Sequence, residues 1–198
     1  NKLANLKSGV YEISPSQNLE EILKMLNTGG RPIGEKVTII EGTTVAQIAE
    51  LLSSKGLADK QRFISLANDK SLFSSEFTFL QDQSIVSLEG FLYPETYFIK
   101  KGTSEEDIIR MILTQTKEIY EKNNVFDIPQ NLSPYITNVN QLISLASIVE
   151  KESSSKEYSA RIAGVFIKRL GLDMALGSCP TVEYITGIHR GRVTYEET

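Results

Sequence analysis

Cysteine and histidine are almost absent from this chain. Its 198 residues include one cysteine, Cys179, and one histidine, His189. A single cysteine excludes an internal disulfide, although it leaves the cellular compartment open. A single histidine argues against a histidine-based metal site and against a Ser-His-Asp triad. We therefore expect a site without a metal ion or cofactor. We interpret Cys179 as a buried small residue and His189 as a surface or loop residue.

Long apolar runs are also missing. The sequence contains no stretch of about 18 apolar residues and no apolar core of a signal peptide. Because the chain begins at Asn1 rather than at a methionine, we interpret it as a fragment that has lost an N-terminal targeting or anchoring segment. Its other end looks abrupt, since residues 192–195 resemble a strand entering a turn and residues 196–198 the first turn of a helix.

No cluster of positive charge is present either. The net charge is −4, and the lysines and arginines are scattered, with no basic stripe interleaved with aromatic residues. This pattern argues against a nucleic-acid partner. The chain is 40% hydrophobic and 23% charged, which is typical of a globular protein with one sizeable core or two small ones.

A pattern of strand, turn and capped helix occurs twice in the first half. Residues 10–14 alternate like a short strand, and Asn18 with a glutamate three residues later predicts a capped helix that ends at two glycines. Residues 37–41 predict a second strand, followed by a helix capped by Thr44. A third short helix is predicted over residues 59–66. The pattern predicts a small α/β unit that ends near residue 83.

The second half is predicted to be mostly helical. Residues 86–99 are rich in aromatic and β-branched residues but contain Gly90 and Pro94, which indicates short strands or an irregular extended segment. Thr103 is predicted to cap a helix over residues 104–122. Residues 142–170 predict two helices joined at a serine-rich turn, and the second of them is expected to bury Tyr158, Ile162, Val165 and Phe166.

Glu150 is the best candidate for a working acid. At 100° per residue it lies on the flank of an apolar arc, where a carboxylate is costly unless it is paired, protonated or at the edge of a cleft. Residue chemistry alone favours a structural carboxylate paired with Arg161 or Arg169. Glu152 lies about 200° round the same helix, so the two carboxylates cannot enter one cleft, whereas Ser147 lies about 60° from Glu150 and could hydrogen-bond to it.

Four stretches resemble one known family. SLEGFLYPETYFI (residues 87–99), LASIVEKES (145–153), AGVFIKRL (163–170) and PTVEY (180–184) are similar to YceG-like proteins, the endolytic murein transglycosylases. EGTTVAQIAELLSSKGL (residues 41–57) is similar to the LysM-like module of that family. The resemblance implies an α+β protein with a LysM-like module over residues 1–83. It also implies a catalytic domain over residues 84–198 that is truncated at its C-terminus.

The resemblance also implies an activity and a location. Such a protein is a membrane-anchored bacterial enzyme with a single N-terminal anchor, outside the cytoplasmic membrane. It cleaves nascent peptidoglycan between N-acetylmuramic acid and N-acetylglucosamine and leaves a 1,6-anhydro end. Its partners are glycan strands and, we expect, peptidoglycan synthases. The first glutamate of the Glu-Lys-Glu block, Glu150, would be the catalytic acid and base. We expect substrate contacts from Glu89, Ser147, Glu152, Ser178 and Thr181.

The chain departs from the family at one segment. Where the family has Leu-Gln-Ser-Asp-Pro-Thr, residues 176–181 read Leu-Gly-Ser-Cys-Pro-Thr, so Gly177 and Cys179 replace two polar side chains. These departures leave open a non-catalytic glycan-binding or scaffold protein of the cell-wall machinery. A metal-dependent hydrolase is a third alternative, and a single histidine and a single cysteine give it little support.

Overall fold

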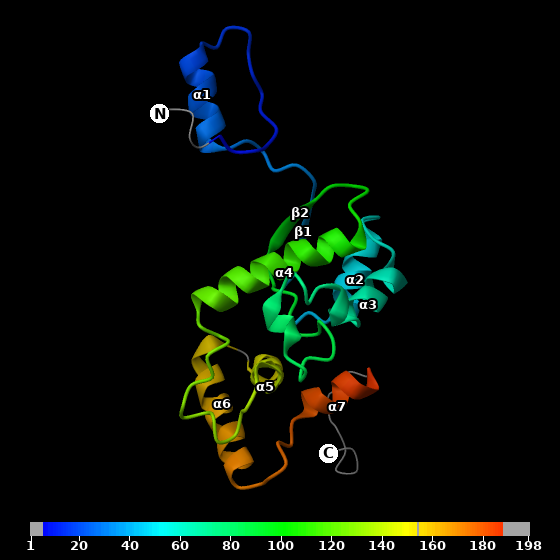
Figure 1. The fold of residues 1–198 in the computed structure, drawn as a ribbon, viewed down its shortest axis with the longest axis vertical. Coiled ribbons are helices and arrows are strands. Elements are labelled where there is room, and N and C mark those ends of the chain that lie inside the picture. The colour runs from blue at the N-terminus through cyan, green and yellow to red at the C-terminus, as the bar shows by residue number, and fades with distance from the viewer. Residues whose placement is uncertain (1–5, 154, 188–198) are drawn as a thin grey trace.

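The structure, a computed structural model, describes residues 6–153 and 155–187 as seven helices, two 3-10 turns and two strands (Figure 1). The predicted α+β class is confirmed. Within the described ranges, no helix has the length and apolar character needed to span a membrane. The elements in chain order are α1 (Leu19–Thr28), β1 (Glu35–Thr38), α2 (Val45–Ser54), α3 (Lys60–Ala67), η1 (Lys70–Leu72), η2 (Thr78–Gln81), β2 (Thr96–Ile99), α4 (Glu105–Lys122), α5 (Val139–Glu152), α6 (Lys156–Gly171) and α7 (Cys179–Thr186).

Helix starts follow the predicted caps closely. Asn18 and Thr44 each accept a hydrogen bond from the backbone of the third helical residue, and the side chain of that residue bonds back, so both capping boxes are present. The cap of α4 is Ser104 rather than the predicted Thr103, because the Ser104 hydroxyl accepts from the Asp107 N–H. The cap is a local interaction, so the sequence places it within one residue.

The strands are shorter than the sequence suggests. β1 and β2 pair antiparallel with Val37 opposite Tyr97, and β1 starts and ends earlier than the predicted strand over residues 37–41. The strand predicted over residues 10–14 is reduced to a single bridge between Val10 and Arg31. An isolated strand pair is only marginally stable in water, and no further strand of the described chain extends this bridge into a sheet.

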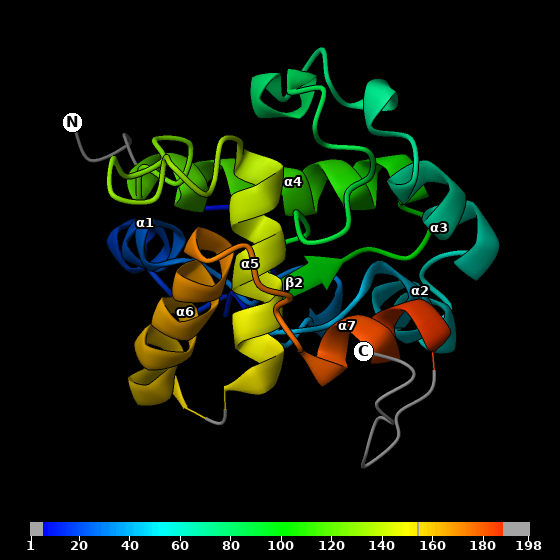
Figure 2. The ribbon, with the colours of Figure 1, turned by 90° about the horizontal axis from the view of Figure 1, so that it is seen from below.

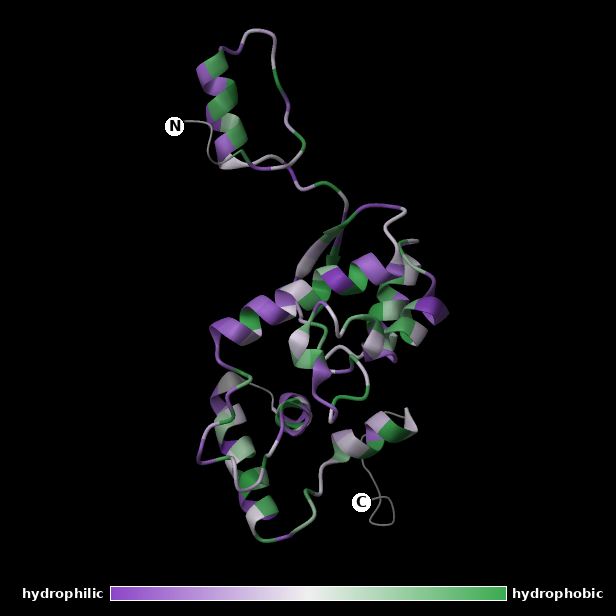
Figure 3. Ribbon diagram, viewed as in Figure 1, coloured by the Kyte–Doolittle hydropathy of each residue, from purple (hydrophilic) through white to green (hydrophobic). Residues whose placement is uncertain are grey.

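Helix α1 stands apart from the other helices at one end of the molecule (Figure 1). It mixes hydrophobic and hydrophilic residues (Figure 3), yet it has no buried residue. Its partly covered side faces the chain before it, where the Lys7 N–H donates to the Leu26 carbonyl at 2.9 Å. This first unit therefore packs mainly on itself.

The main hydrophobic core runs from Val37 on β1 to Leu113 on α4. It includes Phe73 and Phe77, so the polar segment around these two residues packs into the core and is not a free linker. The core continues across residue 83, so the predicted boundary there does not separate two cores. The assignment of residues 1–83 as a LysM-like module stays a prediction.

A second, smaller cluster forms between α5 and α6. Its buried members are Ile136, Leu145, Val149 and Phe166. Tyr158 and Val165 were expected in this interface, but 49% and 52% of their surfaces are exposed, so that part of the prediction is wrong. The reason is that α6 packs chiefly against α5, and a helix with one neighbour buries only a narrow stripe.

Helix α5 connects the two clusters. Val139 and Ile143 pack against the main core, whereas Leu142 and Ile148 pack against the smaller cluster. Residues 88–93 lie between α4 and α5. On one side the buried Thr116 hydroxyl donates to the Phe91 carbonyl at 2.7 Å, and on the other side a Cβ built on Gly90 would lie 2.7 Å from Ile143 Cγ2.

Replacement of Gly90 by alanine should destabilise the chain more than the same change at Gly102. Both glycines have a left-handed backbone, with φ of +81° and +83°, so each alanine costs about 1–2 kcal/mol in backbone strain. A Cβ at Gly102 would have no neighbour within 4 Å, whereas one at Gly90 would lie 2.7 Å from Ile143 Cγ2. The χ1 angle of the β-branched Ile143 is restricted, so this methyl group cannot easily move aside. We expect about 1–3 kcal/mol of additional destabilisation in urea unfolding. Equal losses for the two variants would contradict this packing.

Replacement of Thr116 by valine should also destabilise the chain. The Thr116 hydroxyl donates to the Phe91 carbonyl and accepts from the Tyr93 N–H at 3.2 Å. Valine keeps the shape but leaves these groups unpaired, which should cost about 1–3 kcal/mol in urea unfolding. The control is Thr114→Val on the exposed face of α4, expected to stay within about 0.5 kcal/mol of the parent chain. A neutral Thr116→Val would show that the buried bonds contribute nothing.

Candidate functional site

Glu150 lies near the C-terminal end of α5 with its side chain exposed. It adjoins the turn between β1 and α2, because a Cβ built on Gly42 would lie 3.7 Å from Glu150 Cγ. Lys151 reaches the same turn, with its Nζ 3.3 Å from that position. Sequence reasoning missed this neighbour, since nothing in the pattern of residues 41–44 indicates what the turn contacts.

The structural role considered for Glu150 finds no support in its surroundings. In the part of the chain that the structure describes, no ion pair joins Glu150 to Arg161 or Arg169. Arg169 instead donates to the carbonyl of Leu176. An exposed carboxylate with no structural partner is available to a ligand.

The turn beside Glu150 is well fixed. Gly42 adopts a left-handed backbone with φ of +71°, which favours glycine. The Thr43 hydroxyl donates to the Ile40 carbonyl at 2.7 Å, and Thr44 caps α2. The turn is therefore held at both ends and brings its backbone close to Glu150.

Ser147 lies on the same side of α5 as the segment that contains Gly90. Its hydroxyl donates to the carbonyl of Ile143 at 2.8 Å rather than to Glu150. The Ser147 Oγ is 3.7 Å from a Cβ built on Gly90. Because the side chain is exposed, the oxygen can still accept a hydrogen bond from a ligand.

Glu89 is the partly buried carboxylate of the group. Its two oxygens both accept from the Val45 N–H, each at 3.2 Å, at the N-terminus of α2. The Tyr184 hydroxyl of α7 interacts with the same carboxylate. Burial raises the pKa of Glu89 above its ordinary value, whereas the Val45 N–H and the Tyr184 hydroxyl lower it. Tyr184 ends the family-like stretch PTVEY, but no local pattern indicates its contact with Glu89, which is 95 residues earlier in the chain.

Glu152, Ser178 and Thr181 are joined by one chain of hydrogen bonds. The buried Ser178 hydroxyl donates to Glu152 Oε1 at 2.7 Å, and the Thr181 hydroxyl donates to the Ser178 carbonyl at 2.7 Å. These bonds tie the end of α5 to the start of α7. The bond from Ser178 turns the Glu152 carboxylate toward α7, whereas Glu150 adjoins the Gly42 turn.

Two residues of the departing segment are exposed. Cys179 is the first residue of α7 and is exposed, so the prediction of a buried small residue is wrong. The helix buries no residue completely, and this explains why its first side chain stays in solvent. Gly177 has a left-handed backbone with φ of +59°, and a Cβ there would lie 3.1 Å from the Arg169 guanidinium. His189 and residues 192–198 lie outside the described residues.

The site is thus assembled around α5, which lies between α6 and α7 (Figure 2). The structure places Glu150 and Ser147 beside two glycine-containing segments. It places Glu89 between α2 and α7, and Glu152 with Ser178 and Thr181 at the join of α5 and α7. In the described ranges, no three His, Cys, Asp or Glu side chains come together to form a metal site. The arrangement suits acid–base chemistry by the exposed carboxylate of Glu150.

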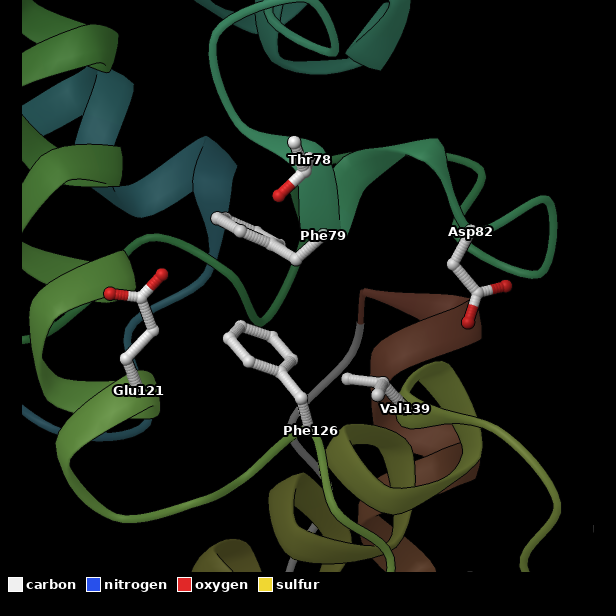
Figure 4. A pocket seen from close by; sticks show the side chains of 6 residues that line it. All are labelled: Thr78, Phe79, Asp82, Glu121, Phe126 and Val139. Atoms are coloured by element: carbon white, nitrogen blue, oxygen red, sulfur yellow. The ribbon is translucent and has the colours of Figure 1, made fainter.

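A separate hollow lies at the other end of α5 (Figure 4). It has a volume of about 350 Å³ and is lined by Thr78, Phe79, Asp82, Glu121, Phe126 and Val139. Phe79 and Phe126 stack in it with ring centroids 5.3 Å apart. Val139 is about 16 Å along the helix axis from Glu150, so this hollow is not the place where Glu150 would act.

Comparisons with known proteins agree on one family. The sequence matches the YceG-like family over residues 1–198. An endolytic murein transglycosylase of Bacillus subtilis (strain 168) is 29% identical over 204 residues, covering 98% of this chain and 55% of that protein. One of Streptococcus pneumoniae serotype 2 is 32% identical over 210 residues, covering 92% of this chain and 36% of that protein. The chain therefore spans about half of the length of these relatives, or less.

A solved structure has the same fold. The crystal structure of a yceG-like protein from Listeria monocytogenes is 30% identical and superposes with a TM-score of 0.70, covering 98% of this chain and 66% of that one. The family match extends over the whole chain and includes the Glu-Lys-Glu block of α5. On this evidence the chain belongs to the YceG-like family.

Proposed function

We propose that the protein to which this chain belongs cleaves glycan strands of nascent peptidoglycan as an endolytic lytic transglycosylase. The bond cut lies between N-acetylmuramic acid and N-acetylglucosamine, and the product carries a 1,6-anhydro end. The observation that carries the proposal is the Glu150 carboxylate, which is exposed on α5 beside the Gly42 turn and has no ion-pair or hydrogen-bond partner among the residues that the structure describes. The endolytic murein transglycosylases among the relatives support the same reaction.

The proposed reaction uses Glu150 twice. Protonated Glu150 donates its proton to the glycosidic oxygen as the bond from that oxygen to the muramyl C1 breaks. Positive charge develops on C1 and the ring oxygen. The resulting Glu150 carboxylate then takes the proton of the muramyl 6-hydroxyl, whose oxygen forms the new bond to C1. One carboxyl group completes the cycle, and Glu152, bonded to Ser178, is not required as a second acid.

The other predicted contacts have different surroundings in the free chain. Ser147 has an exposed hydroxyl, and we propose that it faces the glycan. Ser178 and Glu152 are bonded to each other, and we propose that they serve the substrate by holding α7 in place. Direct contact of the glycan with Glu89, Glu152, Ser178 or Thr181 stays a prediction.

The setting of the reaction is part of the proposal. We place the protein at the outer face of the bacterial cytoplasmic membrane, held by one N-terminal anchor and working beside peptidoglycan synthases. The names of the relatives support a cell-wall substrate. The test must use the complete native protein, because this chain corresponds to 55% of one relative and 36% of another.

Replacement of Glu150 by glutamine should abolish cleavage. Glutamine keeps the size of the side chain but can neither donate nor accept the catalytic proton, so the rate should fall by about 10²–10⁴-fold. The measurement is the release of anhydro-ended muropeptides from purified glycan strands by the complete protein.

The matched control is Glu118→Gln, which removes an exposed carboxylate from α4. It should leave the rate unchanged, and both variants should keep the thermal unfolding midpoint of the parent protein. Continued release of anhydro ends by Glu150→Gln would refute the role of Glu150. Glycan binding by the parent protein without any anhydro product would instead favour a binding or scaffold function.

A further inference from the structure

Glu89 lies where three helices of the site meet. Its carboxylate accepts from the Val45 N–H at the start of α2 and interacts with the Tyr184 hydroxyl of α7. The next residue, Gly90, packs against Ile143 of α5, and its backbone has no room for a Cβ. One two-residue segment therefore contacts α2, α5 and α7.

Burial raises the pKa of Glu89, and its hydrogen bonds act against that shift by favouring the charged form. A carboxylate at a helix N-terminus is stabilised by the unpaired N–H groups and by the helix dipole. Hydrogen bonds to a charged acceptor are also stronger than neutral ones. The Tyr184 hydroxyl is the donor in this contact, and burial and the neighbouring carboxylate raise the pKa of Tyr184 above its ordinary value.

The same contacts lead to the turn beside Glu150 and to α7, which is tied to the end of α5. Val45 comes three residues after Gly42, the residue that adjoins Glu150 and Lys151. Tyr184 belongs to α7, whose N-cap Ser178 is hydrogen-bonded to Glu152 of α5. The contacts form a closed loop. Glu152 joins α5 to α7, Tyr184 joins α7 to Glu89, Glu89 binds the start of α2, and the Gly42 turn before α2 lies against α5.

We propose that Glu89 and Tyr184 form a positioning pair that holds the Gly42 turn and α7 at fixed places relative to α5 and its Glu150. This inference rests on the proposed cleavage and goes further, because it assigns Glu89 to the geometry of the site rather than to contact with the glycan. Loss of the pair leaves Glu150 intact but lets α7 move relative to it. A smaller fraction of bound glycans then has its glycosidic oxygen within reach of Glu150. The rate falls because a small displacement of the reacting atoms is costly.

The first test does not depend on activity. Amide hydrogen exchange is measured on Glu89→Gln, Tyr184→Phe and the double variant, over residues 43–52 and 179–186. Exchange of both segments should become roughly tenfold faster in each single variant, because a bond to a charged group is lost. The controls are Glu118→Gln on α4 and Tyr158→Phe on α6, both at exposed side chains. Unchanged exchange in both segments would overturn the pair.

The second test uses the complete protein and separates kcat from KM. In Glu89→Gln and Tyr184→Phe, kcat should fall roughly tenfold while KM stays within about twofold. The double variant should be no slower than Glu89→Gln, because that change already removes the contact that Tyr184 makes with the charged carboxylate. A rise in KM with unchanged kcat would overturn the proposal and make Glu89 a substrate contact.

The two tests separate this inference from the proposed function. If Glu150→Gln keeps full activity, the cleavage mechanism fails, while hydrogen exchange still decides whether the pair holds α2 and α7. If Glu150→Gln is inactive and Glu89→Gln keeps the kcat of the parent protein, the cleavage stands and the positioning role is wrong.

Discussion

The close approach of Gly90 to α5 is the constraint on which the site depends. A Cβ on Gly90 would lie 2.7 Å from Ile143 Cγ2, so the backbone of residues 88–93 runs directly along α5. Thr116 binds the other side of this segment to α4 through the Phe91 carbonyl. Because α5 also packs into the smaller cluster with α6, the segment fixes that cluster relative to the main core. The candidate side chains lie on α5 or on parts of the chain placed against it in this way.

Three glutamates near this contact have three different surroundings. Glu150 is exposed and has no partner within the described part of the chain, Glu152 accepts a hydrogen bond from Ser178, and Glu89 is partly buried at the start of α2. Although all three are glutamates, their neighbouring groups and their burial differ, and these set the protonation behaviour of a carboxylate. Of the three, Glu150 is the one that is exposed and is not tied to a helix terminus by a hydrogen bond among the described residues. Glu152 is bonded to the N-cap of α7, and Glu89 to the first residue of α2.

Local patterns predicted more than long-range ones did. The caps at Asn18 and Thr44 and the divergence of Glu150 from Glu152 depend on residues within one or two turns, and periodicity was enough to find them. The exposure of Tyr158, Val165 and Cys179 depends on which elements cover them, and no local pattern contains that information. The Gly42 turn was not predicted to be part of the site for the same reason, because its contact with Glu150 joins segments far apart in the sequence. The pairing of Glu89 with Tyr184 is equally remote.

The departures at Gly177 and Cys179 can be judged from what holds α7. Ser178, between them, is the residue whose buried hydroxyl bonds to Glu152, and it is unchanged from the family pattern. Gly177 and Cys179 are both exposed, and the left-handed backbone at Gly177 suits glycine. The attachment of α7 to α5 therefore does not depend on the two altered side chains. Their replacement bears on what α7 offers to a ligand and leaves the attachment of α7 to α5 intact.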